Sequence, residues 1–435
     1  MWSARRPYGR PLGFPLLGGL IVAGLALATI AFEMLPSITT GSRTAEDVVT
    51  TVTTVGSARA GGRATSGVPV GAPNGAPITA LVAVGPAGFA TKPAWAVPVA
   101  QWTKSVAADG GTVLTRDRNG QVLLLDPGSG AVRRLSSTAT GPTQDGPWLT
   151  RIDGRPAAAL VGDGVLSYWP LPTPGADPGP GADPAEGTAV PLPGGTKVSW
   201  VGSAPLVTSA GGGAAVVRGG KYVPVSLPPR ARPLATDGST VLAVVGAQFV
   251  RQAVGAPVAG LRDLPRPRGA GRRPVRVEAV GTDLLFTVWP RTSGHGQLGA
   301  LVRTSDGALA VQTDLEGGLD LAKARVVRET AGTQTLLGPV LVDTYTNNLN
   351  LLDPRYAVRG LTRGHAWALL DGRATDIRLN RTGDFRTEPF PAGDPALPIG
   401  VVAAAGARPE TAVVVTRTGD GWVLAGLRAD SVRAT

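Results

Sequence analysis

Short apolar segments separated by turn residues recur along most of this 435-residue chain, and this repetition constrains the fold more than any other feature. From about Ile78 to Leu427, short runs of Val, Leu and Ala alternate with turns rich in Gly, Asp, Asn and Pro. Long amphipathic helical periodicity is nearly absent from this stretch. The pattern is typical of an all-β domain built from hairpins.

The clearest repeat unit runs from Gly110 to Leu135 and reads as three strands joined by two tight turns. Asn-Gly and Pro-Gly sequences supply the backbone angles that such turns need. The expected strands are Thr112–Thr115, Val122–Leu125 and Val132–Leu135, with turns at Asp117–Gly120 and Asp126–Gly130.

We count about seven such units, and this number favours a closed radial array of sheets. The units begin near Gly110, Trp148, Val198, Arg232, Val275, Ala324 and Ile399. A ring of four-stranded blades leaves only short strand edges exposed, whereas a sandwich has too few strands for this length. The prediction is an all-β fold, a β-propeller of about seven four-stranded blades preceded by one transmembrane helix. Six or eight blades are also compatible with the pattern.

The spread of tryptophans over the units favours a role in the core between blades rather than in a ligand stack. These residues are Trp95, Trp102, Trp148, Trp169, Trp200, Trp289, Trp367 and Trp422.

The segment from Asp117 to Val132 carries the phrase D-x-x-G-x-V-x-x-L-D-x-x-x-G-x-V. In this phrase the chain resembles PQQ-like and WD40-like propeller repeats, in a membrane-anchored form of high-GC Gram-positive bacterial type. The Trp-Asp dipeptide of WD40 repeats and the repeated Trp motif of PQQ blades are absent. The resemblance therefore implies a ring of blades and no specific family.

The N-terminus carries an apolar run, Pro11 to Phe32, behind three arginines. As a helix it is long enough to cross a hydrocarbon core of about 30 Å. Because the positive charge precedes the run, the tail is expected in the cytoplasm and the bulk of the chain outside the plasma membrane. Cleavage after Ala28 as a signal peptide, giving a secreted protein, is the alternative.

Composition divides the rest of the chain into a stalk and a globular part. Residues 1–10 are read as a cytoplasmic tail, 11–35 as the transmembrane helix and 36–77 as a flexible stalk rich in Thr, Ser, Gly and Ala. Residues 78–435 are read as the extracytoplasmic propeller, with loop insertions at 172–188 and 262–276.

No catalytic, metal or cofactor motif is found, so the sequence favours a non-enzymatic protein. The chain has no cysteine, which excludes disulfides and thiolate sites. Its two histidines, His295 and His365, have no neighbour at metal-ligand spacing. Nucleotide-binding and serine-hydrolase signatures are also missing.

A cluster of arginines between two units is the first candidate binding site. Guanidinium groups match the geometry of phosphate and carboxylate, so the cluster suits an anionic lipid, a wall polymer or a protein partner. A solvated loop without function is the alternative. Nucleic acid is not expected, because no aromatic residues are interleaved for base stacking. The cluster consists of Arg262, Arg266, Arg268, Arg272, Arg273 and Arg276.

A second candidate is a polar stretch near the end of the sixth unit. Its amide and phenol groups suit recognition of a sugar or peptide, and they also suit a long turn, which is the favoured interpretation. The residues are Tyr345, Asn347, Asn348, Asn350 and Tyr356.

These features together predict a membrane-tethered extracytoplasmic propeller that serves as a protein-interaction or scaffold module of the cell envelope, in a secretion or envelope complex. The expected partners are the membrane, through the N-terminal helix, and an envelope protein. The alternative is a sugar- or ligand-binding receptor, or an enzyme, that uses the central channel of the ring. Fold alone does not decide between these functions.

Overall fold

The computed structural model describes residues 81–99, 106–108, 112–136, 145–171, 187–293, 295–315, 321, 324–328, 334–344, 347–362, 364–379, 385–391, 398–402, 410–418 and 421–430. The chain divides into two units, Met1–Ala58 and Arg59–Thr435, and every described residue belongs to the second. The predicted tail, transmembrane helix and stalk lie outside the described residues. Among the described residues, no helix has the length and hydropathy needed to span a bilayer.

The described strands form eight sheets of four strands each, which we call blades 1 to 8. Blade 1 contains β2 (Val106–Ala108), β3 (Thr112–Arg116), β4 (Val122–Leu125) and β5 (Val132–Arg134). Blade 2 contains β6 (Asp145–Ile152), β7 (Arg155–Gly162), β8 (Val165–Pro170) and β9 (Thr188–Pro191). Blade 3 contains β10 (Thr196–Ser199), β11 (Leu206–Ser209), β12 (Ala214–Arg218) and β13 (Lys221–Val225). Blade 4 contains β14 (Arg232–Thr236), β15 (Thr240–Val245), β16 (Gln248–Ala253) and β17 (Arg262–Asp263).

The remaining four blades come from the second half of the chain and from one early strand. Blade 5 contains β18 (Arg276–Val280), β19 (Leu284–Pro290), β20 (Gln297–Arg303) and β21 (Leu309–Leu315). Blade 6 contains β22 (Val326–Arg328), β23 (Gln334–Leu337), β24 (Val340–Asp343) and β25 (Asn348–Leu351). Blade 7 contains β26 (Ala357–Thr362), β27 (His365–Leu370), β28 (Arg373–Arg378) and β29 (Arg386–Pro389). Blade 8 contains β30 (Pro398–Val402), β31 (Thr411–Thr418), β32 (Gly421–Arg428) and β1 (Trp95–Val99).

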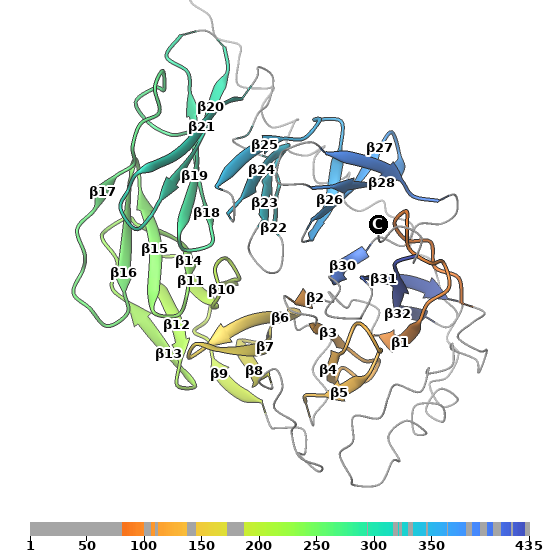
Figure 1. Cartoon of the computed structure of the whole chain (residues 1–435). Helices are drawn as coiled ribbons and strands as arrows, with labels where there is room; N and C mark the ends of the chain where they lie inside the picture. The colour runs from red at the N-terminus through yellow and green to blue at the C-terminus, as the bar shows by residue number, and fades with distance from the viewer. Residues whose placement is uncertain are drawn as a thin grey trace, which may run out of the picture. The chain divides into compact units, whose positions relative to one another are not determined.

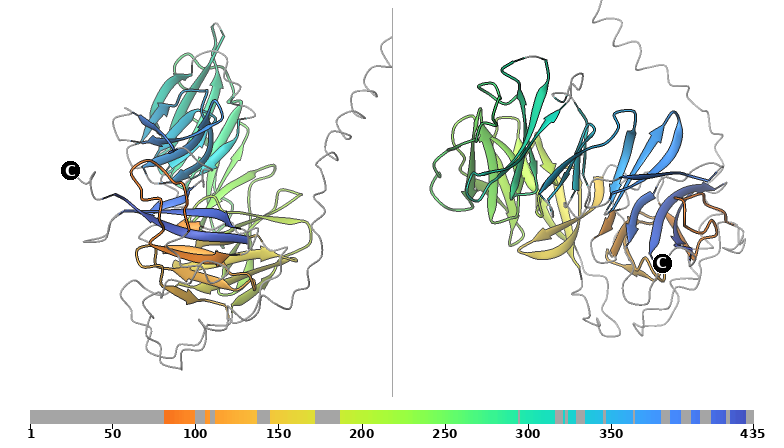
Figure 2. Two further views of the ribbon diagram at one scale, coloured as in Figure 1. Left: turned by 90° about the vertical axis from the view of Figure 1, so that its right-hand side faces the viewer. Right: turned by 45° about the horizontal axis from the view of Figure 1, so that its top comes forward.

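The blades follow one another around a ring, which is the arrangement of an eight-bladed β-propeller (Figure 1). In blades 1 to 4 the first strand of each sheet lies toward the centre and the fourth lies at the rim, whereas in blade 8 β30 lies inward and β1 outward (Figure 1). Blade 8 closes the ring, because β1 from the start of the described chain pairs antiparallel with β32 from its end. Both views of Figure 2 show this early strand beside the last strands of the chain.

Local turn chemistry explains the strand boundaries. In the unit Gly110–Leu135 the observed strands β3, β4 and β5 match the predicted ones to within a residue. The carboxylate of Asp117 accepts hydrogen bonds from the amides of Asn119 and Gln121, and Gly120 adopts a φ of 78°. This conformation favours glycine and fixes the register of the hairpin. The sequence prediction for this unit is confirmed.

The core consists of separate apolar clusters between neighbouring blades. The cluster between blades 4 and 5, for example, contains Phe249 from β16 and Trp289 from β19, both of which are almost fully buried. Similar clusters lie at each of the other junctions, including the one between blades 8 and 1. The predicted place of the tryptophans is confirmed for the four that are buried: Trp95, Trp169, Trp289 and Trp367.

The predicted count of about seven blades is corrected to eight. The difference arises in the single unit expected from Ala324 to about Leu379, which holds blade 6 and most of blade 7. Blade 6 consists of strands of three or four residues, and the sequence pattern did not separate it from blade 7 because strand and turn signals mark hairpins and not the boundary between two blades.

Candidate functional site

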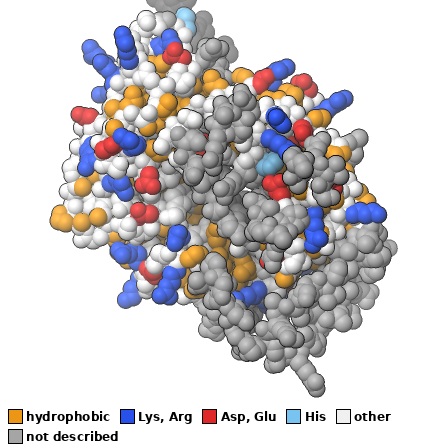
Figure 3. All heavy atoms as spheres, viewed as in Figure 1, with side chains coloured by type: hydrophobic (Ala, Val, Ile, Leu, Met, Phe, Trp, Pro, Cys, Tyr) orange, Lys and Arg blue, Asp and Glu red, His pale blue; other side chains and the backbone are white. Residues whose placement is uncertain are grey.

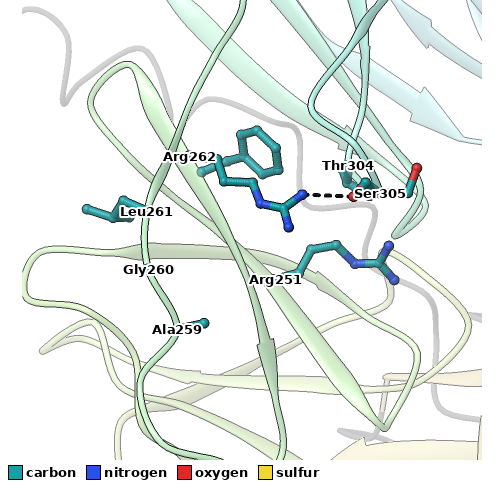
Figure 4. Close-up of a pocket in the computed structure, with 8 residues that line it drawn as sticks. Arg251, Ala259, Gly260, Leu261, Arg262, Thr304 and Ser305 are labelled. Atoms are coloured by element: carbon teal, nitrogen blue, oxygen red, sulfur yellow. Dashed lines mark hydrogen bonds between the residues drawn. The ribbon is translucent and has the colours of Figure 1, made fainter.

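A pocket of about 590 Å³ lies between blades 4 and 5, and two arginines line it. Its walls come from β16, from the connection that leads into β17, and from the turn between β20 and β21 (Figure 4). The volume lies within the range of small-ligand pockets, about 300–1,000 Å³. The lining residues are Phe249, Arg251, Ala259, Gly260, Leu261, Arg262, Thr304 and Ser305.

One buried glutamine holds the connection that forms the outer wall. The Gln252 side-chain amide donates to the carbonyls of Ala253, Ala256 and Pro257, at 3.0 to 3.1 Å. Its Oε1 accepts from the amide of Ala259 at 2.8 Å. Because Gln252 is fully buried and these bonds are satisfied, the connection is held in one conformation.

The opposite wall is the turn between β20 and β21, which is held within blade 5 and packs against blade 4. Thr304 is fully buried and donates through Oγ1 to the carbonyl of Thr282 at 2.7 Å. A side chain at Gly307 would stand 3.6 Å from the ring of Phe249, so the turn rests on that ring. Arg262 bridges the two walls by donating from Nη1 to the carbonyl of Ser305 at 2.8 Å.

The pocket is positively charged. Arg251 and Arg262 extend toward the Thr304–Ser305 turn from adjacent strands, while the side chain of Leu261 points away from them (Figure 4). None of the eight lining residues is acidic. The nearby Asp306 is engaged elsewhere: the amide of Ala308 and the guanidinium of Arg303 lower the pKa of its carboxyl. The two guanidinium groups are therefore not neutralised by an acid of the pocket itself.

The arginine cluster predicted from the sequence begins in this pocket and divides into three groups. Arg262 belongs to the pocket itself. Arg266, Arg268, Arg272 and Arg273 are exposed on the connection from β17 to β18. Arg276 is largely buried at the start of β18. Basic side chains are visible in several groups on the described surface (Figure 3).

The connection that carries the four exposed arginines is tied down along its backbone. The amide of Arg268 donates to Oε1 of Gln312 at 3.2 Å. Ala270 is buried and forms an isolated bridge with Arg291, and the amide of Gly271 donates to the carbonyl of Pro290 at 2.7 Å. The guanidinium groups are thus presented from a fixed backbone on blade 5.

Arg276, in contrast, is held by contacts inside the protein. Its Nε lies 2.9 Å from Oε1 of Glu278, and its Nη1 donates to the carbonyls of Leu321 and Ala324. Arg328 of β22 also contacts Glu278, at 3.4 Å. Burial lowers the pKa of Arg328, and the Glu278 carboxylate opposes this effect. Arg276 therefore joins blades 5 and 6 and is not available to a partner.

The predicted polar stretch belongs to a hairpin of blade 6. Asn347 occupies the turn with a φ of 54°, and Asn348 and Asn350 lie on the rim strand β25. Tyr356 is packed against the cluster between blades 6 and 7. Tyr345 lies outside the described residues. The stretch and the arginine pocket are on different blades, so the structure does not bring the two candidates into one site.

The two histidines differ in their burial. His295 is exposed. His365 is buried in β27, with Nδ1 3.0 Å from Asp376, Nε2 3.8 Å from Glu410, and its ring stacked on Trp367. Burial lowers the pKa of His365, but the hydrogen bonds to Asp376 and Glu410 outweigh it and raise the pKa to about 9. The described residues contain no group of three metal-ligating side chains.

The sequence interpretation missed Arg251, Gly260 and Ser305 as possible binding residues. Arg251 is a single arginine inside a strand, and Ser305 belongs to an ordinary turn, so neither stands out from its local pattern. Their shared site becomes visible only in the structure, where blades 4 and 5 bring all three residues to one pocket with Arg262.

Comparison with known proteins gives structural likeness without a family. No family model matches the chain, and no curated protein matches it. Solved structures similar to it include BamB from Moraxella catarrhalis, with 16% identity over 78% of this chain and 99% of that one and a TM-score of 0.36. A streptogramin B lyase matches with 12% identity over 77% and 95% of the two chains and a TM-score of 0.36. AztD from Citrobacter koseri matches with 16% identity over 67% and 89%, again with a TM-score of 0.36. Values this low support neither a shared family nor a shared function.

Proposed function

We propose that this protein is a membrane-tethered, extracytoplasmic interaction module of the cell envelope that binds an anionic protein partner and performs no catalysis. The observation that carries the proposal is the concentration of guanidinium groups on blades 4 and 5. Two arginines line a pocket, and four more are exposed on the adjoining connection, whose backbone is fixed. The apolar run behind three arginines supports the membrane tether.

Several arginines on a fixed backbone favour recognition over non-specific attraction. Guanidinium groups bind carboxylates through paired hydrogen bonds, and a connection whose backbone is already held loses less backbone freedom on binding. Long-range attraction from the net charge of +11 adds to the rate of association and is weakened by salt.

The test is recovery of partners from detergent-solubilised membranes with the tagged full-length chain. The test variant replaces Arg266, Arg268, Arg272 and Arg273 by Gln. The matched control replaces four exposed arginines on other blades, Arg134, Arg155, Arg218 and Arg373, and so makes the same change in net charge.

We expect the test variant to lose partners that the control variant keeps, at physiological ionic strength. Equal recovery with both variants would contradict the proposed binding face. Equal loss with both variants would show that net charge alone governs recovery, and would also contradict it.

A further inference from the structure

We propose that the pocket between blades 4 and 5 binds an extended acidic peptide segment of the partner, with one carboxylate held between Arg251 and Arg262. This inference rests on the proposed function and names the group that the site recognises. It is carried by the two arginines, by unpaired main-chain groups at the pocket wall, and by open space beside them.

The arginines define the charge of the occupant. Both line the same pocket, and the eight lining residues include no acid. Within the described residues, no carboxylate forms an ion pair with Arg251. Arg262 uses Nη1 for the carbonyl of Ser305, which leaves its other nitrogens as donors. Two guanidinium groups that converge in a partly enclosed site therefore favour one carboxylate with several accepted hydrogen bonds.

The main chain of the pocket wall favours a peptide over an isolated anion. Within the described part of the chain, no protein group hydrogen-bonds to the backbone of Gly260 or Leu261, whereas the neighbouring Ala259 amide is held by Gln252. An extended peptide can satisfy such free amide and carbonyl groups with its own main chain. A phosphate or a lipid head group would use the arginines and leave the backbone carbonyls unpaired.

Open space beside Gly260 allows a peptide to approach the pocket wall. A Cβ atom at Gly260 would have no heavy atom within 4 Å, and Gly260 does not require a positive φ. A peptide strand can therefore come close to the wall at this residue. The same property makes Gly260 a position where a larger side chain can block the pocket without straining the backbone.

The experiment measures binding of labelled peptides to the full-length chain in detergent by fluorescence anisotropy. The probe is acetyl-Val-Thr-Glu-Thr-Val-amide carrying a fluorophore, and its control has Gln in place of Glu. Protein variants are Arg251→Gln, Arg251→Glu and Gly260→Trp. Matched controls are Arg218→Gln, an exposed arginine on blade 3, and Gly194→Trp, a glycine that also has open space around it.

We expect the Glu peptide to bind and the Gln peptide to bind at least about tenfold more weakly. Arg251→Gln and Gly260→Trp should each raise the Kd by about tenfold or more, while Arg218→Gln and Gly194→Trp leave it within about twofold. Arg251→Glu should abolish the preference for the Glu peptide over the Gln peptide, because the new carboxylate neutralises Arg262.

Three results would overturn the inference. The first is equal affinity for the Glu and Gln peptides, and the second is full displacement of the probe by inorganic phosphate at concentrations comparable to those of the peptide. The third is binding to vesicles with anionic lipid that Gly260→Trp abolishes while peptide binding is unchanged. If peptide binding fails but partner recovery still depends on Arg266, Arg268, Arg272 and Arg273, the proposed function stands and the pocket assignment falls.

Discussion

At the scale of single residues, burial decides which arginine is structural and which is free to bind. Arg273 and Arg276 are only three positions apart and look alike in the sequence, yet one is exposed and the other contacts Glu278 and two carbonyls. The sequence could predict a group of arginines but not this division, because the two carbonyls that accept hydrogen bonds from Arg276 lie 45 and 48 residues further along the chain. Arg251 was missed for the same reason.

The contrast between Arg273 and Arg276 gives the first stability prediction. Arg276→Gln should lower the free energy of unfolding by about 3 kcal/mol, because it removes one of the two guanidinium partners of Glu278 and takes the Arg276 donor from two carbonyls in a largely buried site. Arg273→Gln should change it by less than about 0.5 kcal/mol. Chemical denaturation of the full-length chain measures both values, and similar values for the two variants would contradict the assigned environments.

The buried histidine gives a pH-dependent prediction. The pKa of His365, raised to about 9 in the folded protein, lies above its unfolded value of about 6.5. The protonated ring therefore stabilises the fold fully below about pH 6.5, and this contribution is lost as the pH rises through about 9. We expect a loss on the order of 3 kcal/mol over this window.

Denaturation curves at several pH values check this prediction. Three charged groups face the ring or its partner: Asp376, Glu410 and Arg378, whose Nε lies 3.8 Å from Asp376. His365→Gln should flatten the pH profile, and His295→Gln, at an exposed position, should leave it unchanged. A profile that keeps its slope in His365→Gln would assign the effect to another group.

At the scale of strands and sheets, local patterns identify hairpins but not their grouping. The unit Gly110–Leu135 could be predicted strand by strand, since its turn residues act only on their neighbours. Blade 6 was not separated from blade 7, because strand and turn signals mark hairpins and not the boundary between two blades. The strand β1 could not be assigned to blade 8, since its partner β32 lies more than 320 residues away and no local signal encodes that pairing.

Packing of β32 against Trp95 gives a prediction for this closing sheet. Trp95 is buried, its Nε1 donates to the carbonyl of Pro127 at 2.7 Å, and its ring lies where a side chain at Gly426 would be. Gly426→Val should therefore lower the free energy of unfolding by about 2 kcal/mol or more, through overpacking. Gly260→Ala, with open space around it, should be close to neutral. An unchanged melting temperature for Gly426→Val would contradict this contact.

At the scale of the whole molecule, the fold depends on one closed ring of blades. Apolar clusters at every junction between blades make each blade part of two interfaces, so stability is shared around the ring. Closure depends on β1 and β32, which come from opposite ends of the described chain. The binding pocket between blades 4 and 5 relies on the same type of junction, in which the side chains of one blade rest on the next.

An engineered disulfide across this closing pair tests the ring most directly, and the chain's lack of cysteine makes the result unambiguous. Val97 and Leu424 are register partners on β1 and β32, and facing positions in antiparallel strands have the Cα spacing that a disulfide needs. The variant Val97→Cys with Leu424→Cys, oxidised in the folded full-length chain, should form an intramolecular cross-link, seen as a faster-migrating band without reductant. Val97→Cys with Val423→Cys, one position out of register, should not, because neighbouring side chains point to opposite faces. Failure of the register pair to cross-link, or equal cross-linking of both pairs, would contradict the closed eight-bladed ring.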